Sequence, residues 1–351
     1  MKKYYTRACN FFYGEISKQK IKNKLSLPLN GDEDISFDEI EIISNNFKKK
    51  IKISKIKYLN IKLKNQIKVH LNNITKKKKF KNLNLSKKPI LMGILNITPD
   101  SFSDGGKYLE TNKALKQCKE LINSGCEIID IGGESTRPGS VEINDEEEWG
   151  RIENVLRNVS KLKSIISLDS RKVSVMRKAS KFKINLINDI SGLNYSKDTI
   201  NFLKSTNLPF VIHHIQGNPQ TMQKNPKYKN VLIDIYNYFE LKIKMIRSAG
   251  IKHNNILLDP GIGFGKNLKH NITILNQISI FHSLGFPVML GISRKRFIKD
   301  ISGNNDSKER IGGTVSSSIF SMLQGVQILR IHDVNEVNQG IKVFKKLNFN
   351  K

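Results

Sequence analysis

Cysteine is scarce in this sequence, which leaves little room for disulfide, metal or thiol chemistry. The three cysteines, Cys9, Cys118 and Cys126, show neither the CxxC spacing of a metal or redox motif nor the pattern of a disulfide framework. We therefore expect a reducing compartment in which the cysteines serve as packing residues.

Long apolar runs are absent as well. No stretch approaches the ~18 apolar residues needed to span a bilayer. The N-terminal MKKYYTRACNFFYG is positively charged but has only a short aromatic run before Glu15, which is too little for the apolar core of a signal peptide. We expect a cytoplasmic protein with no membrane partner.

The sequence has few acidic residues for its number of basic ones. It holds 60 Lys+Arg and 31 Asp+Glu, a net charge of +29, which would ordinarily suggest a nucleic acid or anionic surface as partner. Residues 1–88 hold 23 basic and 7 acidic residues (+16), and residues 89–351 hold 37 and 24 (+13). Because Lys, Asn and Ile are all used heavily, we interpret the charge as a compositional bias on solvated surfaces and expect no nucleic-acid partner.

Two regions differ in organisation. Residues 1–75 mix possible strands at 37–43 and 51–64 with a possible helix near 16–25. This region is an α+β accessory unit, an arm that binds RNA or a partner, or a partly ordered extension, and we assign it no chemistry. The run KKKKFKNLNLSKK, 76–88, predicts a solvated, Lys-rich linker.

From residue 89 to 351, short apolar runs alternate with segments of helical period or composition. The apolar runs lie at 89–95, 127–131, 165–168, 185–188, 209–214, 256–259, 287–290 and 326–330. The helical segments include 111–124, 145–163, 229–249 and 308–324. Eight such units imply parallel strands and favour an α/β fold of the (β/α)8 TIM barrel type over an open doubly wound sheet. Thr111 and Asn144 are expected helix caps, and Gly125 and Gly250 expected helix ends.

Polar residues follow all eight expected strands. They are Asn96, Glu134 to Arg137, Asp169, Asn188 and Asp189, His213 and His214, Asp259, Ser293 to Lys295, and Arg330 to Asp333. One polar residue at a strand end is ordinary, but eight in succession indicate a polar ligand at one mouth, where TIM barrels bind substrates.

These residues form two chemical sets. Asp169, Asn188 and Asp259 are short, fixed side chains suited to a flat heterocycle that presents paired N–H donors. The second set is Arg137, Arg330, His332 and, close by in the barrel order, Asn96. It can surround an anion such as diphosphate. Phosphate leaving groups usually bring Mg²⁺ with few protein ligands, and Asn96 is the candidate ligand.

The glycine-rich stretch LDPGIGFGKN, 258–267, is not a nucleotide-binding loop. Its glycines alternate at Gly261, Gly263 and Gly265, whereas a Walker loop has four residues between its two glycines and Ser or Thr after the Lys. The dinucleotide pattern fails too, because its third glycine would come one position later. We expect no phosphate role for Lys266.

Seven motifs together resemble those of the dihydropteroate synthases. They are GILNITPDSFSDGG (93–106), DIGGESTRPG (130–139), LINDISGL (186–193), HHIQGNPQTMQ (213–223), LLDPGIGFGKNLKHN (257–271), GISRK (291–295) and RIHDV (330–334). They occur in the family's order and cover nearly all of residues 89–351. The resemblance implies a transferase of folate biosynthesis that joins 6-hydroxymethyl-7,8-dihydropterin diphosphate to 4-aminobenzoate. It also implies a Mg²⁺ cofactor, a homodimer and a target of sulfonamides.

The resemblance implies roles for individual residues. The pterin-binding residues would be Asp169, Asn188, Asp259 and Lys295, with Phe264 packing on the ring; the diphosphate-binding residues would be Arg137, Arg330 and His332, with Asn96 as the Mg²⁺ ligand. Phe102, Thr136 and Pro138 would shape the aminobenzoate site. Asp100, Arg137 and Lys295 would be catalytic, the first two on loops that close over the site.

The implied mechanism is loss of diphosphate followed by attack of the neutral aromatic amine. Arg, His⁺ and Mg²⁺ would hold the departing anion while Asp169 and Asp259 favour the developing pterin cation. The amine is neutral near pH 7 and needs positioning more than deprotonation. No covalent enzyme intermediate is required.

Four positions depart from the family pattern. Arg171 in DSRK stands where the family often has DTS, and Arg296 where it often has a small hydroxyl residue near the aminobenzoate. Ile262 replaces a common Phe, and His213 a common Met that packs against the pterin. The polar set remains intact despite these changes.

Three other hypotheses remain open. Another pterin-binding barrel, such as a methyltetrahydrofolate methyltransferase, would share Asp169, Asn188 and Asp259, but would not need GGESTRPG, SRK and RIHD together. A basic nucleic-acid-binding protein would explain the charge but not the ordered strand-end residues. An inactive relative is the third, although every expected diphosphate residue is present.

Overall fold

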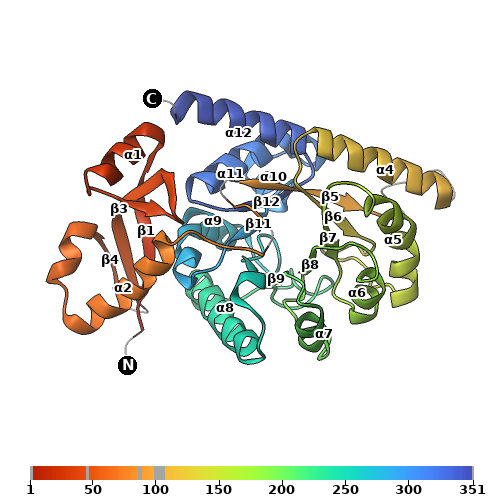
Figure 1. The fold of residues 1–351 in the computed structure, drawn as a ribbon, viewed down its shortest axis with the longest axis horizontal. Coiled ribbons are helices and arrows are strands. Elements are labelled where there is room, and N and C mark those ends of the chain that lie inside the picture. The colour runs from red at the N-terminus through yellow and green to blue at the C-terminus, as the bar shows by residue number, and fades with distance from the viewer. Residues whose placement is uncertain (1–2, 45–46, 82, 86–88, 99–106, 350–351) are drawn as a thin grey trace.

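The computed structural model describes residues 3–44, 47–81, 83–85, 89–98 and 107–349, and they form two parts packed side by side (Figure 1). The N-terminal part, red and orange in Figure 1, is a small antiparallel sheet with helices. The remainder is a ring of parallel strands surrounded by helices.

The ring contains eight parallel strands. They are β5 (Ile90–Asn96), β6 (Ile128–Gly132), β7 (Ile165–Asp169), β8 (Leu186–Asp189), β9 (Phe210–His213), β10 (Ile256–Asp259), β11 (Met289–Gly291) and β12 (Ile328–Ile331). They pair in the order β10-β9-β8-β7-β6-β5-β12-β11. A parallel bridge between Leu258 and Val288 joins the two ends of this order. The predicted (β/α)8 TIM barrel is confirmed.

Helices connect successive strands and cover the outside of the ring. They are α4 (Lys107–Asn123), α5 (Asp145–Val159), α6 (Val173–Ala179), α7 (Thr199–Thr206), α8 (Val231–Ser248), α9 (Leu268–Asn276), α10 (Arg296–Ser302), α11 (Ile311–Leu323) and α12 (Val334–Asn348), with the short turns η2 (His253–Asn255), η3 (Ile278–Leu284) and η4 (Lys308–Arg310). In the described ranges, every helix is too short or too polar to cross a membrane.

The helix boundaries follow local chemistry at three of the four positions that were expected to mark them. Asn144 caps α5, because its side chain accepts a hydrogen bond from the Glu147 amide at 2.8 Å. Gly125 and Gly250 follow α4 and α8 with φ of 96° and 89°, a backbone region that favours glycine. The expected cap at Thr111 is wrong, since Thr111 lies inside α4.

Side chains that point inward from alternate positions of the strands fill the inside of the barrel. Its lower part is an apolar cluster formed by Phe80, Leu85, Ile90, Met92, Ile128, Leu186, Val211, Leu257, Met289 and Ile328. Side chains two positions apart lie on the same face of a strand. The residues that come two positions after these apolar strand residues, nearer the carboxyl ends of the strands, therefore also face inward. This geometry directs Asp130, Asn188 and Asp259 to the mouth of the barrel.

The N-terminal part is an α+β unit. Its elements are β1 (Tyr5–Tyr13), α1 (Gly14–Lys22), β2 (Leu27–Leu29), β3 (Asp32–Ser44), β4 (Phe47–Lys52), η1 (Ile53–Tyr58) and α2 (Ile61–Thr75). The long strand β3 pairs antiparallel with β1 along one edge and with β2 and β4 along the other.

The strand expected at 51–64 is wrong beyond its first two residues. Asn60 caps a helix there, its side chain accepting from the Leu63 amide at 3.0 Å. Ile67 and Ile74, seven residues apart and so on one face of α2, are fully buried. Burial of this face selects the helix over the local alternation of Ile and Lys.

The N-terminal unit and the barrel share one hydrophobic core. The ring of Tyr5 packs edge-on against Tyr236 of α8 at 5.0 Å between centroids, and its hydroxyl donates to Asn237 Oδ1 at 2.9 Å. Ser279 of η3 donates to the Ala8 carbonyl at 3.0 Å. The unit is therefore a fixed part of the molecule.

The segment after α2 is more buried than expected. Phe80 and Leu85 belong to the apolar cluster that closes the lower end of the barrel, and Lys78 is also buried, its ammonium donating to the His282 carbonyl at 3.3 Å. The expectation of a solvated linker is wrong at these three positions, because the open end of the barrel exposes apolar side chains that need a cover.

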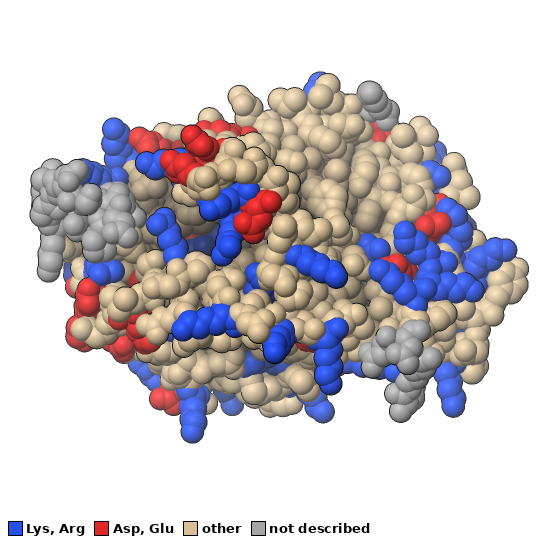
Figure 2. All heavy atoms as spheres, turned by 180° about the vertical axis from the view of Figure 1, so that it is seen from behind, with Lys and Arg blue, Asp and Glu red and all other residues tan. Residues whose placement is uncertain are grey.

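Basic residues are spread over much of the surface. Figure 2 shows Lys and Arg at many separate places on one face, with a denser group at the right, where the N-terminal unit lies. Asp and Glu lie among them in several places.

Candidate active site

The mouth of the barrel collects inward-facing polar side chains from seven strands. They are Asn96 of β5, Asp130 of β6, Asp169 of β7, Asn188 of β8, His213 of β9, Asp259 of β10 and Arg330 of β12. Asn96 and Arg330 are half-buried and the other five are buried. Six of these residues were expected at strand ends, and the strands bring them to the same mouth; Asp130 was not expected.

Arg330 lies between two carboxylates. Its Nε is 2.6 Å from Asp130 Oδ2, and its Nη2 is 2.5 Å from Asp169 Oδ2. Sequence reasoning grouped Arg330 with the anion-binding residues and Asp169 with the heterocycle-binding ones, but the structure joins them directly. The two expected sets therefore meet at one guanidinium.

Asp130 is a site residue that sequence reasoning missed. It lies in the middle of β6, two register positions below the strand ends at which polar residues are expected. The available signal was a lone Asp inside the apolar run EIIDI. A buried carboxylate in a barrel strand needs a cation or a ligand, and Arg330 is the cation here.

Among the residues that the structure describes, several buried polar atoms at the mouth find no hydrogen-bond partner. They include Asp130 Oδ1, Asn188 Oδ1 and His213 Nδ1. The Asn188 side-chain amide donates to Asp130 Oδ2 at 3.1 Å, which fixes its orientation. Since buried polar atoms are nearly always hydrogen-bonded, these three atoms indicate a ligand that supplies N–H or O–H groups.

Asp259, Phe264 and Lys295 form one wall of the mouth. The Lys295 ammonium lies 4.1 Å from the centroid of the Phe264 ring. Phe264 packs edge-on against His213 at 4.5 Å, and His213 Nε2 is 4.0 Å from Asp259 Oδ2. Phe264 thus presents an aromatic surface among charged groups, which suits a flat polar ring.

Burial shifts the pKa values of the charged side chains at the mouth. It raises the pKa of Asp259 to about 6, against an opposing hydrogen bond from the Gly261 amide. Burial and the positive charge of Arg330 lower the pKa of Lys295 to about 8. Burial also raises the pKa of Asp169, although the Arg330 charge opposes the rise.

The backbone of the glycine-rich loop after β10 passes close to the backbone that follows β9. Gly261 has φ of 70°, and a Cβ there would lie 2.0 Å from the His214 carbonyl oxygen. The Lys266 ammonium is buried in the loop, where it contacts His214 Nδ1 at 3.0 Å and donates to the Phe264 carbonyl at 2.8 Å. Lys266 therefore holds neighbouring loops together.

The surroundings of His332 favour its neutral form. Burial and the charges of Arg330 and Arg294 lower its pKa to about 3. Its Nδ1 lies 3.1 Å from Ser293 Oγ, which links the loops after β11 and β12. Arg294 forms an ion pair with Asp333 between the same loops. The lowered pKa opposes the protonated form of His332 that the sequence predicts. A bound anion beside the ring would raise this pKa.

The loop after β6 carries three of the expected site residues. Thr136 is half-buried, and Arg137 and Pro138 are exposed. The roles expected for Thr136, Arg137 and Pro138 stay predictions. Asp100 and Phe102 lie outside the described residues.

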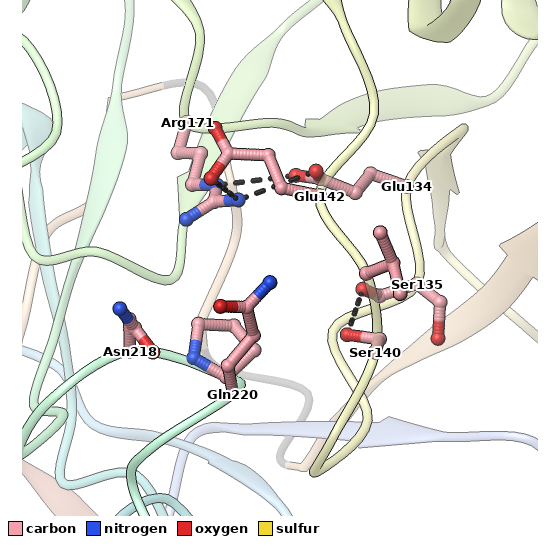
Figure 3. Close-up of a pocket in the computed structure, with 9 residues that line it drawn as sticks. Glu134, Ser135, Ser140, Glu142, Arg171, Asn218 and Gln220 are labelled. Carbon is pink, nitrogen blue, oxygen red and sulfur yellow. Dashed lines mark hydrogen bonds and ion pairs between the residues drawn. The ribbon is translucent and has the colours of Figure 1, made fainter.

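The four departures from the family pattern have different surroundings. Ile262 is buried in the main core, and Arg296 is exposed and pairs with Asp300 at 3.6 Å. His213 presents its unpartnered Nδ1 at the mouth. Arg171 is buried against Glu134 at the base of the loop after β6 (Figure 3).

The comparisons with known proteins agree with this geometry. Residues 92–332 match the model of a family described as pterin binding enzyme. Dihydropteroate synthase of Escherichia coli (strain K12) is 41% identical over 256 residues, which are 73% of this chain and 90% of that protein.

Solved structures give the same result. The Yersinia pestis dihydropteroate synthase with a sulfonamide drug complex has a TM-score of 0.71 at 37% identity, and the match covers 76% of this chain and 96% of that one. Dihydropteroate synthase from Xanthomonas albilineans in complex with 7,8-dihydropteroate has a TM-score of 0.68 at 31% identity and covers 76% and 95%. The family model leaves residues 1–91 unmatched.

Proposed function

The chain belongs to the dihydropteroate synthases, pterin-binding transferases of folate biosynthesis, and from this membership we propose the reaction that occurs at the barrel mouth. The amine of 4-aminobenzoate attacks the methylene carbon of 6-hydroxymethyl-7,8-dihydropterin diphosphate. The bond from that carbon to the diphosphate oxygen breaks, a C–N bond forms, and the amine loses a proton. The products are 7,8-dihydropteroate and diphosphate.

One observation carries this proposal: buried acceptors lie beside an aromatic wall at the mouth, and two of them, Asn188 Oδ1 and His213 Nδ1, have no hydrogen-bond partner among the described residues. Asp259, Asn188 Oδ1 and His213 Nδ1 offer acceptors to the amino and ring N–H groups of a pterin. Phe264 and the Lys295 ammonium above it offer a surface for the flat ring. A buried carboxylate can accept two parallel N–H bonds, so Asp259 would fix the orientation of the pterin.

Arg330 would act on both halves of the substrate. Its guanidinium is held by Asp130 and Asp169 at 2.5–2.6 Å, so it is placed without help from the ligand. A fixed cation beside the scissile C–O bond stabilises charge on the leaving diphosphate without reorganising. Asp169 and Asp259 would meanwhile stabilise positive charge that spreads into the pterin ring as the bond breaks.

The residues at the mouth also fit a magnesium ion. Asn96 offers one neutral amide oxygen from the end of β5, and the described residues contain no cluster of three or more His, Cys, Asp and Glu that would form a protein cage. Mg²⁺ typically keeps several waters and few protein ligands. When bound with the diphosphate, the ion would neutralise charge on the leaving group.

The loop after β6 would complete the site for the amine. Thr136 and Pro138 would position 4-aminobenzoate, and Arg137 would approach the diphosphate. The aromatic amine is a neutral nucleophile near pH 7, so alignment with the methylene carbon is the main requirement.

The direct test is amine-dependent release of diphosphate. The purified full chain with Mg²⁺ and the pterin diphosphate should release diphosphate when 4-aminobenzoate is added and only slowly without it. Release at equal rates with and without the amine would indicate hydrolysis and contradict the proposed transfer.

Pterin binding should depend on pH on both sides of neutrality. Affinity should rise as Asp259 ionises through about pH 6 and fall as Lys295 loses its proton through about pH 8. Calorimetric titration with 6-hydroxymethyl-7,8-dihydropterin lacking the diphosphate tests this, because the ligand then has no phosphate group to titrate. An affinity that is constant from pH 5 to pH 9 would contradict the assignment; Lys295→Met should remove only the alkaline limb.

We also propose that the chain forms a homodimer through the outer faces of α11 and α12. Helix α11 has no charged residue in a chain that is 26% charged. Three large apolar side chains are exposed on these helices, Phe320 at 44%, Val343 at 54% and Leu347 at 60%. Interface cores are depleted of charge in this way, and a two-fold dimer would place the same face on both subunits.

A charge in this face should dissociate the dimer. Phe320→Lys should shift the sedimentation equilibrium at micromolar concentration from dimer to monomer, because two lysines would meet near the two-fold axis. Leu241→Lys on α8 is the matched control, since Leu241 is also exposed but lies on another helix. A variant that sediments like the wild type would contradict the proposed interface.

A further inference from the structure

The loop between β6 and α5, residues 133–144, has no regular structure of its own. It carries Thr136, Arg137 and Pro138, which the proposed function places against the second substrate and the diphosphate. A loop of this length loses considerable conformational entropy when it is held in one position. Contacts at its two ends therefore matter for how often it is correctly placed.

Both ends of the loop converge on Arg171 (Figure 3). At the start, Arg171 Nε and Nη2 contact the two carboxylate oxygens of Glu134 at 3.1 and 3.2 Å, which is a two-pronged ion pair. At the end, Arg171 Nη2 lies 3.3 Å from Glu142 Oε2. One guanidinium from the loop after β7 thus ties together residues that are eight positions apart in the sequence.

Tyr195 contacts both Arg171 and Glu142. The Arg171 guanidinium lies 4.7 Å from the centroid of the Tyr195 ring, within the range of a cation–π contact. The Tyr195 hydroxyl donates to Glu142 Oε1 at 2.6 Å. Glu142 is therefore held by two groups, although its side chain is 45% exposed.

Lys172 makes further contacts to both ends of the same loop. Its buried ammonium lies 2.8 Å from Glu148 Oε2 and 3.3 Å from Glu134 Oε1, and it donates to the Ile143 carbonyl at 2.5 Å. The Ile143 amide in turn donates to Glu134 Oε1 at 3.2 Å. Lys172 fixes the inner part of the clamp, so Arg171 is the component that reaches Glu142.

The tip of the loop crosses to the neighbouring loop after β9. The Gly139 amide donates to the Pro219 carbonyl at 3.0 Å. Within the loop, the Ser140 hydroxyl donates to the Ser135 carbonyl at 2.6 Å. With its base clamped and its tip bonded, the segment 135–140 has a defined position beside the barrel mouth.

We propose that Arg171 is a positioning residue that clamps both ends of the 133–144 loop, so that the base of the loop is held in place before substrates bind and the loop closes from there over the site. The inference rests on the proposed function only for what the ordered loop does, which is to hold the 4-aminobenzoate side of the site. The ordering itself is a property of the unliganded chain and is independent of turnover.

Hydrogen exchange of the full chain without substrates tests the clamp directly. In Arg171→Ser, amides of peptides covering 134–143 should exchange at least about tenfold faster than in the wild type, because the open loop state becomes more populated. Arg171→Lys should restore part of the protection, since it keeps the charge without the two-pronged geometry. Arg157→Ser is the matched control, because Arg157 pairs with Glu153 at 3.2 Å on the exposed face of α5.

Kinetics then tests the consequence. Arg171→Ser should raise the KM for 4-aminobenzoate about tenfold while kcat and the KM for the pterin diphosphate change less than about threefold, since ground-state placement of one substrate is lost. Arg171→Lys should recover part of the change. A fall in melting temperature with unchanged KM would assign Arg171 a structural role only and overturn the proposal.

The two proposals can fail separately. Unchanged exchange of the 134–143 amides in Arg171→Ser would show that Lys172 alone orders the loop, whatever the enzyme catalyses. Faster exchange without any turnover in the wild type would keep the clamp and reject the proposed reaction. Faster exchange with an unaltered KM would separate loop order from substrate binding and overturn the positioning role.

Discussion

Asp259→Asn should abolish most of the activity and at the same time stabilise the protein. Asp259 is buried at the end of β10, where its carboxylate would accept two N–H groups of the pterin. Charge-assisted hydrogen bonds contribute about 1.5–3 kcal/mol each, so losing both and introducing an amide donor should lower kcat/KM by roughly a thousandfold. Steady-state kinetics in the pterin diphosphate measures this loss.

The stability change follows from the pKa of Asp259. Burial raises it from 3.8 to about 6 in the folded chain, so the free energy of unfolding falls as pH rises from about 3.8, where the unfolded chain ionises, and the penalty is complete above about pH 6. A neutral Asn avoids this penalty and should raise the free energy of unfolding at pH 7 by on the order of 1–3 kcal/mol. At pH 4 the difference should nearly vanish, because Asp259 is then protonated in the folded state.

Asp198→Asn provides the matched control for both measurements. Asp198 is exposed before α7 and makes no side-chain cap bond. Its replacement should change neither kcat/KM nor the unfolding free energy appreciably. If Asp259→Asn proved as active as this control, the pterin would not bind where we place it.

Arg330→Met should remove activity and destabilise the fold. Without the guanidinium, Asp130 and Asp169 remain buried with no cation between them. Leaving buried charges uncompensated typically costs about 3–5 kcal/mol, and chemical denaturation at pH 7 should show a loss of this size. The loss should shrink at pH 5, because Asp169, whose pKa is raised by burial, can then take up a proton.

A second substitution separates the structural from the catalytic part of the Arg330 effect. Adding Asp130→Asn to Arg330→Met should recover part of the stability but none of the turnover, so the two substitutions should be strongly non-additive in unfolding free energy. Additive effects on stability would mean that the Arg330–Asp130 pair is not the contact that holds the guanidinium. Full recovery of turnover would contradict the role of Arg330 at the leaving group.

The barrel could be predicted from the sequence because its signals are local. Apolar runs such as ILLD at 256–259 are long enough to be recognised as strands, and the structure has β10 at these residues. The polar residues that follow each run then identify the mouth, because parallel strands of a barrel bring their carboxyl ends together. No long-range information was needed for that step.

The contacts across the mouth could not be predicted in the same way. Asp130 lies within an apolar strand, and its importance depends on Arg330, which is 200 positions away in the sequence. The order of strands around the barrel places β12 next to β5, which in turn pairs with β6, and only this geometry joins the anion-binding and heterocycle-binding sets. A side chain that spans the barrel interior leaves no local pattern.

The N-terminal region shows how burial overrides local pattern. The alternating Ile and Lys of 51–64 resemble a strand, yet Ile67 and Ile74 bury one face of the helix α2. Phe80 and Leu85 lie in a Lys-rich segment that predicts a solvated linker, yet they close the lower end of the barrel. In both cases the deciding surface belongs to a distant part of the chain.

One measurement tests the central claim most directly: simultaneous quantification of diphosphate and 7,8-dihydropteroate formed by the full chain from the pterin diphosphate, 4-aminobenzoate and Mg²⁺. We expect both products in equal amounts, only when the amine is present, and neither above background in Asp259→Asn or Arg330→Met. Wild-type protein that is folded by circular dichroism but forms no 7,8-dihydropteroate would contradict the account, as would variants that form it at the wild-type rate.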